Sequence, residues 1–434
     1  MSRASRFSRR RFLKTAAAVS VGGPLILASV SELRAAPNER ISIGFIGMGI
    51  RARQLLDGFL GRPDVQVVAV CDIHTERREA AVKKIDEKYG KDKKDGASKG
   101  CRIFGDFREL LEQQKDLDAV VIATPDHWHA IPCIAAAKAK KDIYCEKPLT
   151  LTITEGRKIV EAVKENKIIF QTGSQQRSEF GNYFRTAVEY VRSGRIGKLK
   201  SIKIGDGVGD SPIPCDLPDQ DTPEGTDWDM WLGPAPKRAY HEDLCPRKVH
   251  NHFPAFRKYR EYAGGYLADM GAHHFDIAQW ALDMDKSGPV KIEPPKDEKS
   301  KRGLRFVYAN GIEMIHTDGG PDCSFEGADG TINATRGGIS CKPEGILKEP
   351  LTDKDFHVFP SNNHIANWIE CVKSRKETIC PAETGHRSAT ICHLANIGYQ
   401  LRTSLAWDPE KERFVDNAEA DKLLTREMRA PWKL

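Results

Sequence analysis

Two short motifs carry residues suited to acid–base chemistry. Lys147 stands in Glu146-Lys147-Pro148, directly after a predicted strand, where its ammonium can donate a hydrogen bond to a developing alkoxide. Asp269 and His273 are four residues apart in a predicted helix and therefore share one face of it. Because imidazole titrates near neutral pH, we predict His273 as the general base and Asp269 as the group that orients its ring or binds a substrate hydroxyl. A helix cap at Asp269 and a structural histidine at His273 are the simpler alternatives.

A glycine turn near the start of the chain predicts a dinucleotide site. Gly47-Met48-Gly49-Ile50-Arg51-Ala52 fits the pattern G-x-G-x-x-A, between a predicted strand and a predicted helix. Gly47, Gly49 and Ala52 would let the backbone approach a pyrophosphate at the helix N-terminus. Asp72 follows the next predicted strand, 25 residues after Gly47. Its carboxylate would bind ribose hydroxyls and repel a 2′-phosphate, which favours NAD over NADP; a cap of the following helix is the alternative role.

Two further strand ends are predicted to lie along the cofactor. Thr124 and Pro125 end the apolar run 119–123, where the chain would pass the nicotinamide ribose. His129 at the next helix start and Glu146 at a later strand end complete the residues predicted to bind the cofactor. Glu146 is alternatively a group that orients Lys147.

The predicted substrate contacts lie beside these strand ends. His127 and Trp128 could form a wall for a sugar, which offers apolar C–H faces to aromatic rings. Gln175 and Arg177 follow the predicted strand 168–172 and are predicted to hold substrate hydroxyls, with surface polarity as the alternative. No metal site is predicted, because the spacing of the histidines fits no known zinc pattern. The histidines considered for it are His127, His129, His250 and His252.

The predicted elements bring these motifs to one edge of a sheet. Strands at 41–46, 65–70, 119–123, 143–145 and 168–172 alternate with helices at 51–60, 76–89, 130–140 and 154–166. This alternation is typical of an α/β doubly wound parallel sheet, which binds ligands at the carboxyl ends of its strands. The predicted division is a signal segment at 1–36, a Rossmann domain at 37–172, and a substrate-binding and oligomerisation domain at 173–434.

The second half predicts an α+β domain with a largely antiparallel, open-faced sheet. A strand at 199–204 and hairpins at Asn310-Gly311 and Asp329-Gly330 indicate the sheet, and helices are predicted at 183–193, 268–282, 364–373 and 387–402. Helices on one face leave the other face to solvent or to a second copy, so we expect a homo-oligomer through this sheet. Residues 210–262, rich in Pro, Asp, Trp and Tyr, are expected to close over the crevice. Their Trp228, Trp231 and Tyr240 are expected to form a small core of the loop, with lining of the sugar cleft as the alternative.

Together with Thr124–His129, the motifs Glu146-Lys147-Pro148 and Asp269-Met270-Gly271-Ala272-His273 make the chain resemble the glucose–fructose oxidoreductase, inositol dehydrogenase and MocA (Gfo/Idh/MocA) family. The resemblance implies hydride transfer between a sugar or polyol C–OH and a nicotinamide, with Lys147 as the family lysine and His129 as a recurrent histidine. A redox-neutral, NAD-using glycosidase or epimerase acting through a keto sugar is the alternative. A non-catalytic sugar-binding protein is disfavoured by Lys147 and the Asp269/His273 pair.

The N-terminal residues predict the cellular compartment of the protein. Residues 1–36 account for the whole net charge of +6 in the 434-residue chain, and the neutral remainder gives no reason to expect nucleic acid as a partner. Ser8–Lys14 (SRRRFLK) resembles the signal of the twin-arginine machinery, which exports folded proteins. We therefore expect a periplasmic protein, with an uncleaved membrane anchor as the alternative.

Export bears on the cysteines and on the cofactor. The 11 cysteines include no Cys-x-x-Cys pair and are expected to be mostly buried thiols, although Cys215 and Cys245 could pair late. Free NAD should be scarce outside the inner membrane. We therefore expect the protein to keep its nicotinamide bound through repeated turnovers.

Overall fold

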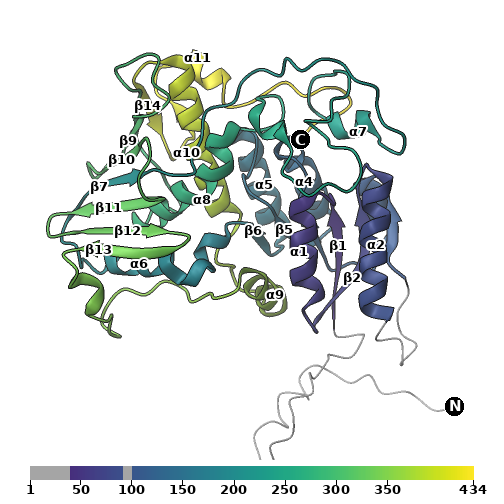
Figure 1. The fold of residues 1–434 in the computed structure, drawn as a ribbon, viewed down its shortest axis with the longest axis horizontal. Helices are drawn as coiled ribbons and strands as arrows, with labels where there is room; N and C mark the ends of the chain where they lie inside the picture. The colour runs from purple at the N-terminus through teal and green to yellow at the C-terminus, as the bar shows by residue number, and fades with distance from the viewer. Residues whose placement is uncertain (1–39, 91–99) are drawn as a thin grey trace, which may run out of the picture.

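The computed structural model describes residues 40–90 and 100–434 (Figure 1). The predicted export signal and the loop 91–99 lie outside the described residues. Two sheets organise the described chain, one of six strands and one of nine. Within the described ranges, no helix combines the length and apolar character needed to cross a membrane.

The first sheet is parallel throughout and has the strand order β3-β2-β1-β4-β5-β6. Its strands are β1 (Ile41–Ile46), β2 (Val65–Cys71), β3 (Arg102–Phe104), β4 (Ala119–Ile122), β5 (Asp142–Cys145) and β6 (Phe170–Thr172). The strand order changes direction between β1 and β4, because β2 and β3 lie on one side of β1 while β4, β5 and β6 lie on the other. The carboxyl ends of these two strands therefore border the crevice in which sheets of this order bind ligands.

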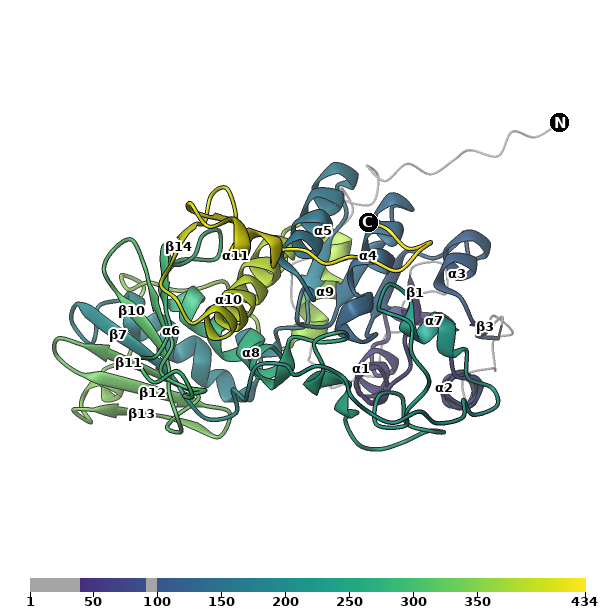
Figure 2. The same ribbon diagram turned by 90° about the horizontal axis from the view of Figure 1, so that it is seen from above.

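Helices cover both faces of the first sheet (Figure 2). One face packs against α1 (Ile50–Leu60) and α2 (Thr75–Gly90), and the other against α3 (Phe107–Gln113), α4 (Ala130–Lys138) and α5 (Ile153–Asn166). Strands covered on both faces should be apolar along their whole length, and all four residues of β4 are fully buried. The first face is completed by α9 (His364–Ser374), whose Trp368 packs edge-on against Phe59 and Tyr144.

The second sheet has the order β13-β12-β11-β7-β10-β9-β8-β14-β15, and only its β7–β10 pair is parallel. Its strands are β7 (Leu199–Ile204), β8 (Lys291–Glu293), β9 (Arg305–Val307), β10 (Glu313–His316), β11 (Cys323–Gly327), β12 (Thr331–Thr335), β13 (Gly338–Lys342), β14 (Leu405–Asp408) and β15 (Arg413–Phe414). Both predicted hairpins are present, as β9–β10 and β11–β12.

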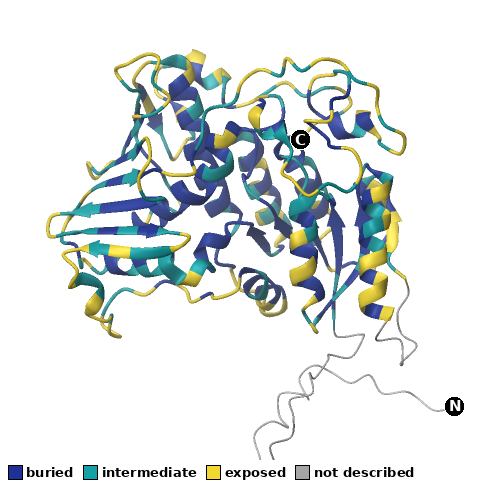
Figure 3. Cartoon of the chain, viewed as in Figure 1, coloured by how far each residue is buried: buried dark blue, intermediate teal, exposed yellow. Residues whose placement is uncertain are grey.

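Helices α6 (Tyr183–Arg192), α8 (Gly265–Ala281) and α10 (Ala382–Leu401) cover one face of this sheet. Strand β12 shows the alternation, because Ile332 and Ala334 are fully buried against the helices while the residues between them are partly exposed. The opposite face carries polar pairs such as Lys203 with Glu326. Helices α8 and α10 are buried along most of their length in the middle of the molecule (Figure 3).

Residues 210–262 form a cover over the first sheet's crevice, which we call the cover segment. It holds α7 (Trp228–Leu232), and its own core includes Trp228, Trp231 and Tyr240, with the two indoles stacked at 4.7 Å. Its backbone joins the N-terminal domain through an isolated bridge between Thr226 and His74. Both expectations for this segment therefore hold, since it closes over the crevice and has a core of its own.

The C-terminal segment after α11 (Ala418–Lys422) crosses to the N-terminal domain (Figure 2). Arg426 binds Glu155 of α5 at 2.7 Å. Arg429 binds Asp229 and the carbonyl of Gly233 in the cover segment. Trp432 packs on the indole of Trp128 with ring centroids 4.8 Å apart. This segment ties the cover segment to the first sheet.

Candidate active site

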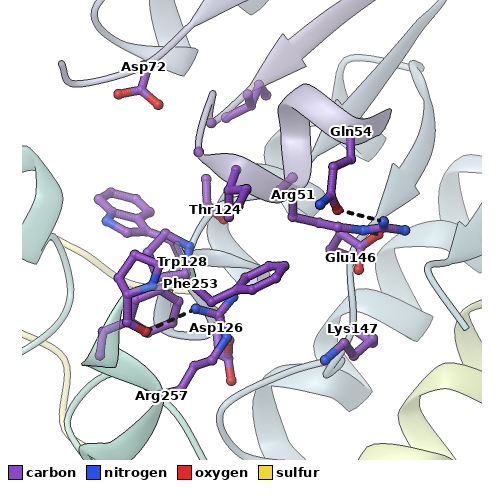
Figure 4. Close-up of a pocket in the computed structure, with 18 of the residues that line it drawn as sticks. Arg51, Gln54, Asp72, Thr124, Asp126, Trp128, Glu146, Lys147, Phe253 and Arg257 are labelled. Carbon is purple, nitrogen blue, oxygen red and sulfur yellow. Dashed lines mark hydrogen bonds and ion pairs between the residues drawn. The ribbon is translucent and has the colours of Figure 1, made fainter. Parts of the chain in front are cut away.

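A cavity of about 540 Å³ opens at the carboxyl edge of the first sheet. Its walls come from the glycine turn, from the ends of β2, β4 and β5, from helix α8 and from the cover segment. This size is within the range of cavities that hold cofactors and small substrates. The predicted cofactor edge and the predicted pair Asp269/His273 therefore meet in one space. Figure 4 shows Asp72, Thr124 and Lys147 around it.

The glycine turn has the geometry that a phosphate needs. Gly47 has φ +87°, and a Cβ there would lie 2.8 Å from the carbonyl oxygen of Ala123. Gly49 is the N-cap of α1, and a Cβ there would meet nothing within 4 Å, so open space lies beside the helix N-terminus. Thr124 lines the same cavity, and its Oγ1 is buried without a hydrogen-bond partner among the described residues. These groups fit a bound dinucleotide.

Asp72 lies at the end of β2 and lines the cavity. Its carboxylate accepts hydrogen bonds from the backbone N–H of Met48 at 2.6 Å and of His74 at 2.8 Å. The second bond precedes α2, so Asp72 fixes the strand–helix turn and also faces the cavity. Arg77 of α2 is buried and donates to the carbonyls of Pro246 and Lys248 in the cover segment.

Lys147 and Asp269 form the closest charged pair in the cavity. The Nζ of Lys147 lies 2.6 Å from Oδ1 of Asp269 and 2.6 Å from its backbone oxygen. Arg257 of the cover segment approaches the same carboxylate at 3.5 Å. Burial alone would raise the pKa of Asp269, but Lys147 and Arg257 outweigh burial and hold it below its ordinary value. Asp269 is therefore an anion that positions two cations.

His273 lies on the same face of α8 as Asp269, and both line the cavity. Asp269 is inside the helix and does not cap it, because the N-cap is Gly264. The prediction that Asp269 orients the His273 ring does not hold, since its carboxylate binds Lys147 and Arg257. Burial, with the nearby charges of Lys147 and Arg336, lowers the pKa of His273 well below its ordinary value. Its ring is therefore neutral at neutral pH.

Glu146 lines the cavity, but among the described residues its carboxylate pairs with Arg51 and Gln175 and not with the ammonium of Lys147. It accepts from Nε of Arg51 at 2.9 Å and from the amide of Gln175 at 3.0 Å. This places Arg51, in the first turn of α1, over the end of β5 (Figure 4). Gln175, predicted as a substrate contact, reaches the cavity and also binds the hydroxyl of Tyr144 at 2.7 Å.

Three residues that were predicted to contact the substrate or the cofactor lie outside the cavity lining. Their contacts are with other parts of the protein. His127 is buried between Trp231 and Tyr262, and its Nε2 bonds the carbonyl of Trp231. His129 bridges the carbonyls of Thr124 and Pro148, so it shapes the strand ends from behind.

Arg177 is the third corrected residue. It is 1% exposed and forms two-pronged ion pairs with Asp276 and Asp285, at 2.7–2.8 Å. Its guanidinium also lies over the ring of Trp280. Trp128, in contrast, lines the cavity as predicted, with Trp432 against its other side.

The remaining histidines and the cysteines have other surroundings. Nδ1 of His250 bonds the carbonyl of His252, and the described residues contain no group of three metal-type ligands. All 11 cysteines are free thiols, including Cys215 and Cys245. The cavity also contains residues that were not assigned from the sequence, namely Asp126, Phe253, Arg257 and Arg336. Asp126 stands inside the quoted motif Thr124–His129, so its position beside a strand end was the available signal.

The fold and this cavity define a two-domain, dinucleotide-binding enzyme. Comparison with protein families is specific: residues 41–174 match the NAD-binding Rossmann fold of the oxidoreductase family Gfo/Idh/MocA, and residues 214–434 match a C-terminal α/β domain of that family. The chain belongs to the Gfo/Idh/MocA oxidoreductase family, and its cofactor is NAD.

Two curated relatives illustrate the range of the family. An inositol 2-dehydrogenase of Salmonella typhimurium is 33% identical over 159 residues, 36% of this chain and 42% of that protein. An alpha-N-acetylgalactosaminidase of Shewanella oneidensis is 30% identical over 211 residues, 44% of each chain. The chain thus matches less than half the length of these relatives.

Solved structures share the fold at low sequence identity. The WlbA dehydrogenase of Bordetella pertussis, in complex with NADH and UDP-GlcNAcA, has a TM-score of 0.57 at 17% identity, covering 85% of this chain and 99% of that one. An aldose-aldose oxidoreductase of Caulobacter crescentus has a TM-score of 0.55 at 16% identity, with the same coverage. The two-domain architecture is therefore that of known dehydrogenases.

Proposed function

We propose that the protein interconverts a C–OH group of a sugar or polyol and the corresponding carbonyl by hydride transfer with an NAD that stays bound between turnovers. The observation that carries this proposal is the single cavity in which the glycine turn, Lys147 and His273 meet. The inositol 2-dehydrogenase relative supports a polyol or sugar as substrate.

In this proposal the protein's own groups hold the reacting oxygen. Bound NAD supplies the hydride acceptor. Lys147, 13% exposed and anchored on Asp269, donates a hydrogen bond to the oxygen as it gains negative charge. Neutral His273 accepts a hydrogen bond from the substrate hydroxyl and so fixes its direction. The cover segment and Trp128 form part of the wall of this space.

The contacts that fasten the cover segment support the proposed retention of the cofactor. Arg53 of α1 donates to the carbonyl of His250, and Arg77 of α2 donates to the carbonyl of Pro246. The C-terminal segment adds the Arg429–Asp229 ion pair and the Trp432–Trp128 contact. These contacts hold the cover segment to α1, α2 and the C-terminal segment at the edge of the cavity.

A redox-neutral reaction is the second candidate. The relative named as an alpha-N-acetylgalactosaminidase favours it, because a bound nicotinamide that is reduced and then re-oxidised by the same sugar needs no second substrate. An exported protein with scarce external NAD would gain from either form. We also propose twin-arginine export to the periplasm and self-association through the open face of the nine-stranded sheet, the latter testable by light scattering at micromolar concentration.

The experiment is turnover by dialysed protein without added NAD. Extraction by denaturation should release about one NAD per chain. The dialysed protein should then convert a polyol or aldose when a second aldose or an artificial electron acceptor is supplied. Activity that appears only with millimolar NAD in the buffer, and increases with it, would contradict the retained cofactor and leave an ordinary soluble-cofactor dehydrogenase. A glycoside hydrolysed without any net change in NADH would identify the redox-neutral reaction.

A further inference from the structure

Arg336 is a cation of the cavity wall to which no task has been assigned. It stands in the turn between β12 and β13, so it reaches the cavity from the second sheet, and it is exposed. The glycine turn and Asp72, which fit the dinucleotide, belong to the first sheet. The charge of Arg336 acts on His273, as that of Lys147 does. Arg336 therefore lies at the end of the cavity where the substrate is proposed to react.

The contacts of Arg336 hold its side chain and leave part of its guanidinium open. Its Nε donates to Oε1 of Gln176 at 2.9 Å, and its guanidinium carbon lies 4.9 Å from the centre of the Phe180 ring. Its backbone N–H donates to Asp322 at 3.0 Å, which fixes the turn. Among the described residues, neither of its Nη groups has a hydrogen-bond or ion-pair partner. These Nη groups are the part of the planar donor fork that remains for a ligand.

The other lysine and arginine side chains of the cavity wall already have oxygen partners in the protein. Those with carboxylate partners in the cavity are Lys147 and Arg257, which approach Asp269, and Arg51, which pairs with Glu146. Arg77 donates to backbone carbonyls. Within the described ranges, no carboxylate lies at ion-pair distance from the guanidinium of Arg336, and Asp322 and Asp269 act on its charge from farther away. An anion in the cavity would therefore find its pairing partner at Arg336.

The loop beside Arg336 has an unusual backbone. Phe180, Gly181 and Asn182 have φ values of +57°, +61° and +61°. Residues with a side chain rarely adopt this region, and such conformations are typical of ligand sites. Phe180 lines the cavity, and its ring packs edge-on against Phe184 of α6 with centroids 6.4 Å apart. The wall thus presents an aromatic ring next to the open guanidinium.

We propose that Arg336 binds an anionic substituent of the substrate, so that the preferred substrates are sugars or cyclitols that carry a carboxylate. The planar fork of a guanidinium matches a carboxylate through two parallel N–H···O bonds. The ring of Phe180 offers its face to the apolar C–H groups of the same sugar. The carbon that exchanges hydride is then a different one, held at Lys147 and His273. This inference deepens the function proposed above and rests on it.

The test measures kcat/KM of the NAD-loaded protein for matched pairs, namely glucose with glucuronate and galactose with galacturonate. The wild type should prefer the acid by about 10–10²-fold, the contribution typical of hydrogen bonds to a charged group. Arg336→Met should remove this preference, chiefly by raising KM for the acid. Arg336→Lys should keep part of it, because the charge remains while the fork is lost. Lys342→Met is the matched control, since Lys342 is an exposed cation of the same hairpin outside the cavity lining, and it should keep the full preference.

A second readout does not depend on turnover. Calorimetry should show glucuronate binding to the NAD-loaded wild type, weaker at higher salt because Arg336 is exposed, and no such binding to Arg336→Met. NADH affinity should stay within a few-fold in Arg336→Met, which separates substrate binding from cofactor binding. The 6-phosphates of the same sugars distinguish the anion: a phosphate preference that Arg336→Met removes would keep Arg336 as the anion site and replace the carboxylate by a phosphate.

The outcomes separate this inference from the proposed function. Equal use of the acid and the neutral sugar by the wild type, or an acid preference that survives in Arg336→Met, would overturn the inference and leave the hydride-transfer function standing. A large loss of NADH affinity in Arg336→Met would also overturn it and assign Arg336 to the cofactor. A wild type that transfers no hydride to any of these sugars or to a polyol would refute the proposed function, and calorimetry would still decide whether Arg336 binds an anion.

Discussion

Replacing Arg177 with methionine tests whether this residue supports the fold or the substrate. Its guanidinium forms four hydrogen bonds of 2.7–2.8 Å to Asp276 and Asp285. Burial alone would lower the pKa of Arg177, but the two carboxylates raise it well above its ordinary value. In the variant, Asp276 is fully buried, and among the described residues its carboxylate keeps the hydroxyl of Ser388 as its one donor, at 2.6 Å.

The expected loss follows from this burial. Removing one partner of a buried ion pair costs about 3–5 kcal/mol, because the other charge stays behind. This corresponds to a decrease of roughly two to four orders of magnitude in the folding equilibrium constant. Arg185→Met is the matched control, since the bonds of Arg185 in the described part of the chain go to Asn362 and to the carbonyl of Ser361, with no carboxylate among them. We expect the control to lose less than about 1 kcal/mol.

Urea denaturation, followed by circular dichroism, measures both variants, and steady-state kinetics at low temperature measures KM. We expect Arg177→Met to lower the urea midpoint strongly and to leave KM unchanged. A variant that keeps its stability within about 1 kcal/mol of the wild type, while its KM rises tenfold, would refute the structural role and return Arg177 to the substrate site.

Three further predictions concern the cavity. Lys147→Ala should keep the fold and the bound NAD but lose about 10²–10³-fold in turnover, and near wild-type activity would remove Lys147 from the mechanism. Gly47→Ala should lower both the melting temperature and NADH affinity, because φ is +87° and the new Cβ would lie 2.8 Å from the Ala123 oxygen. Gly49→Ala is the matched variant: its Cβ meets no protein atom within 4 Å, so it should lower NADH affinity alone. The ion pairs of Asp269 lower its folded-state pKa, so they stabilise the fold above the unfolded-state pKa and lose this effect as pH falls through the folded-state value. The stability difference between wild type and Asp269→Asn should therefore shrink from about pH 5 to about pH 3, and a constant difference over that range would contradict the pairing.

Periodicity and turn residues predicted most of the fold. The predicted strand at 199–204 has the bounds of β7, and the other predicted elements differ by at most three residues at either end, except α10. That helix begins at Ala382, directly after Pro381. Proline is common at a helix start, but the pattern of apolar residues does not mark this start. Strand β3 was missed because Arg102 and Ile103 are exposed, so no apolar run identifies it.

The site was predicted where function depends on local spacing. The glycine turn, Asp72, Lys147 and the Asp269/His273 pair all line one cavity. The assignments that failed depend on which neighbour comes into contact in three dimensions. No residue near Arg177 in the sequence predicts its ion pairs with Asp276, which lies on α8, and Asp285, which follows it. His127 and His129 likewise form hydrogen bonds with backbone carbonyls. Every residue has a carbonyl, so residue types do not predict which one a histidine will bind.

The cover segment and the C-terminal segment show a second limit. Arg257 and Phe253 reach the cavity only because residues 210–262 fold back across α1 and α2. A long aperiodic stretch predicts a functional loop but not its path. The contact of Trp432 with Trp128 joins residues that are 304 positions apart in the sequence, and no local pattern predicts such a pair.

The C-terminal segment and α9 also bear on how the chain folds during synthesis. Nascent domains generally fold from the N-terminus as they emerge from the ribosome. Here the core around the first sheet is completed by residues made much later. Trp368 of α9 covers Phe59 and Tyr144. Trp432, near the C-terminus, covers Trp128. A ribosome-bound chain stopped before residue 364 would therefore leave an aromatic face open to chaperones, although all six strands of that sheet have already been made.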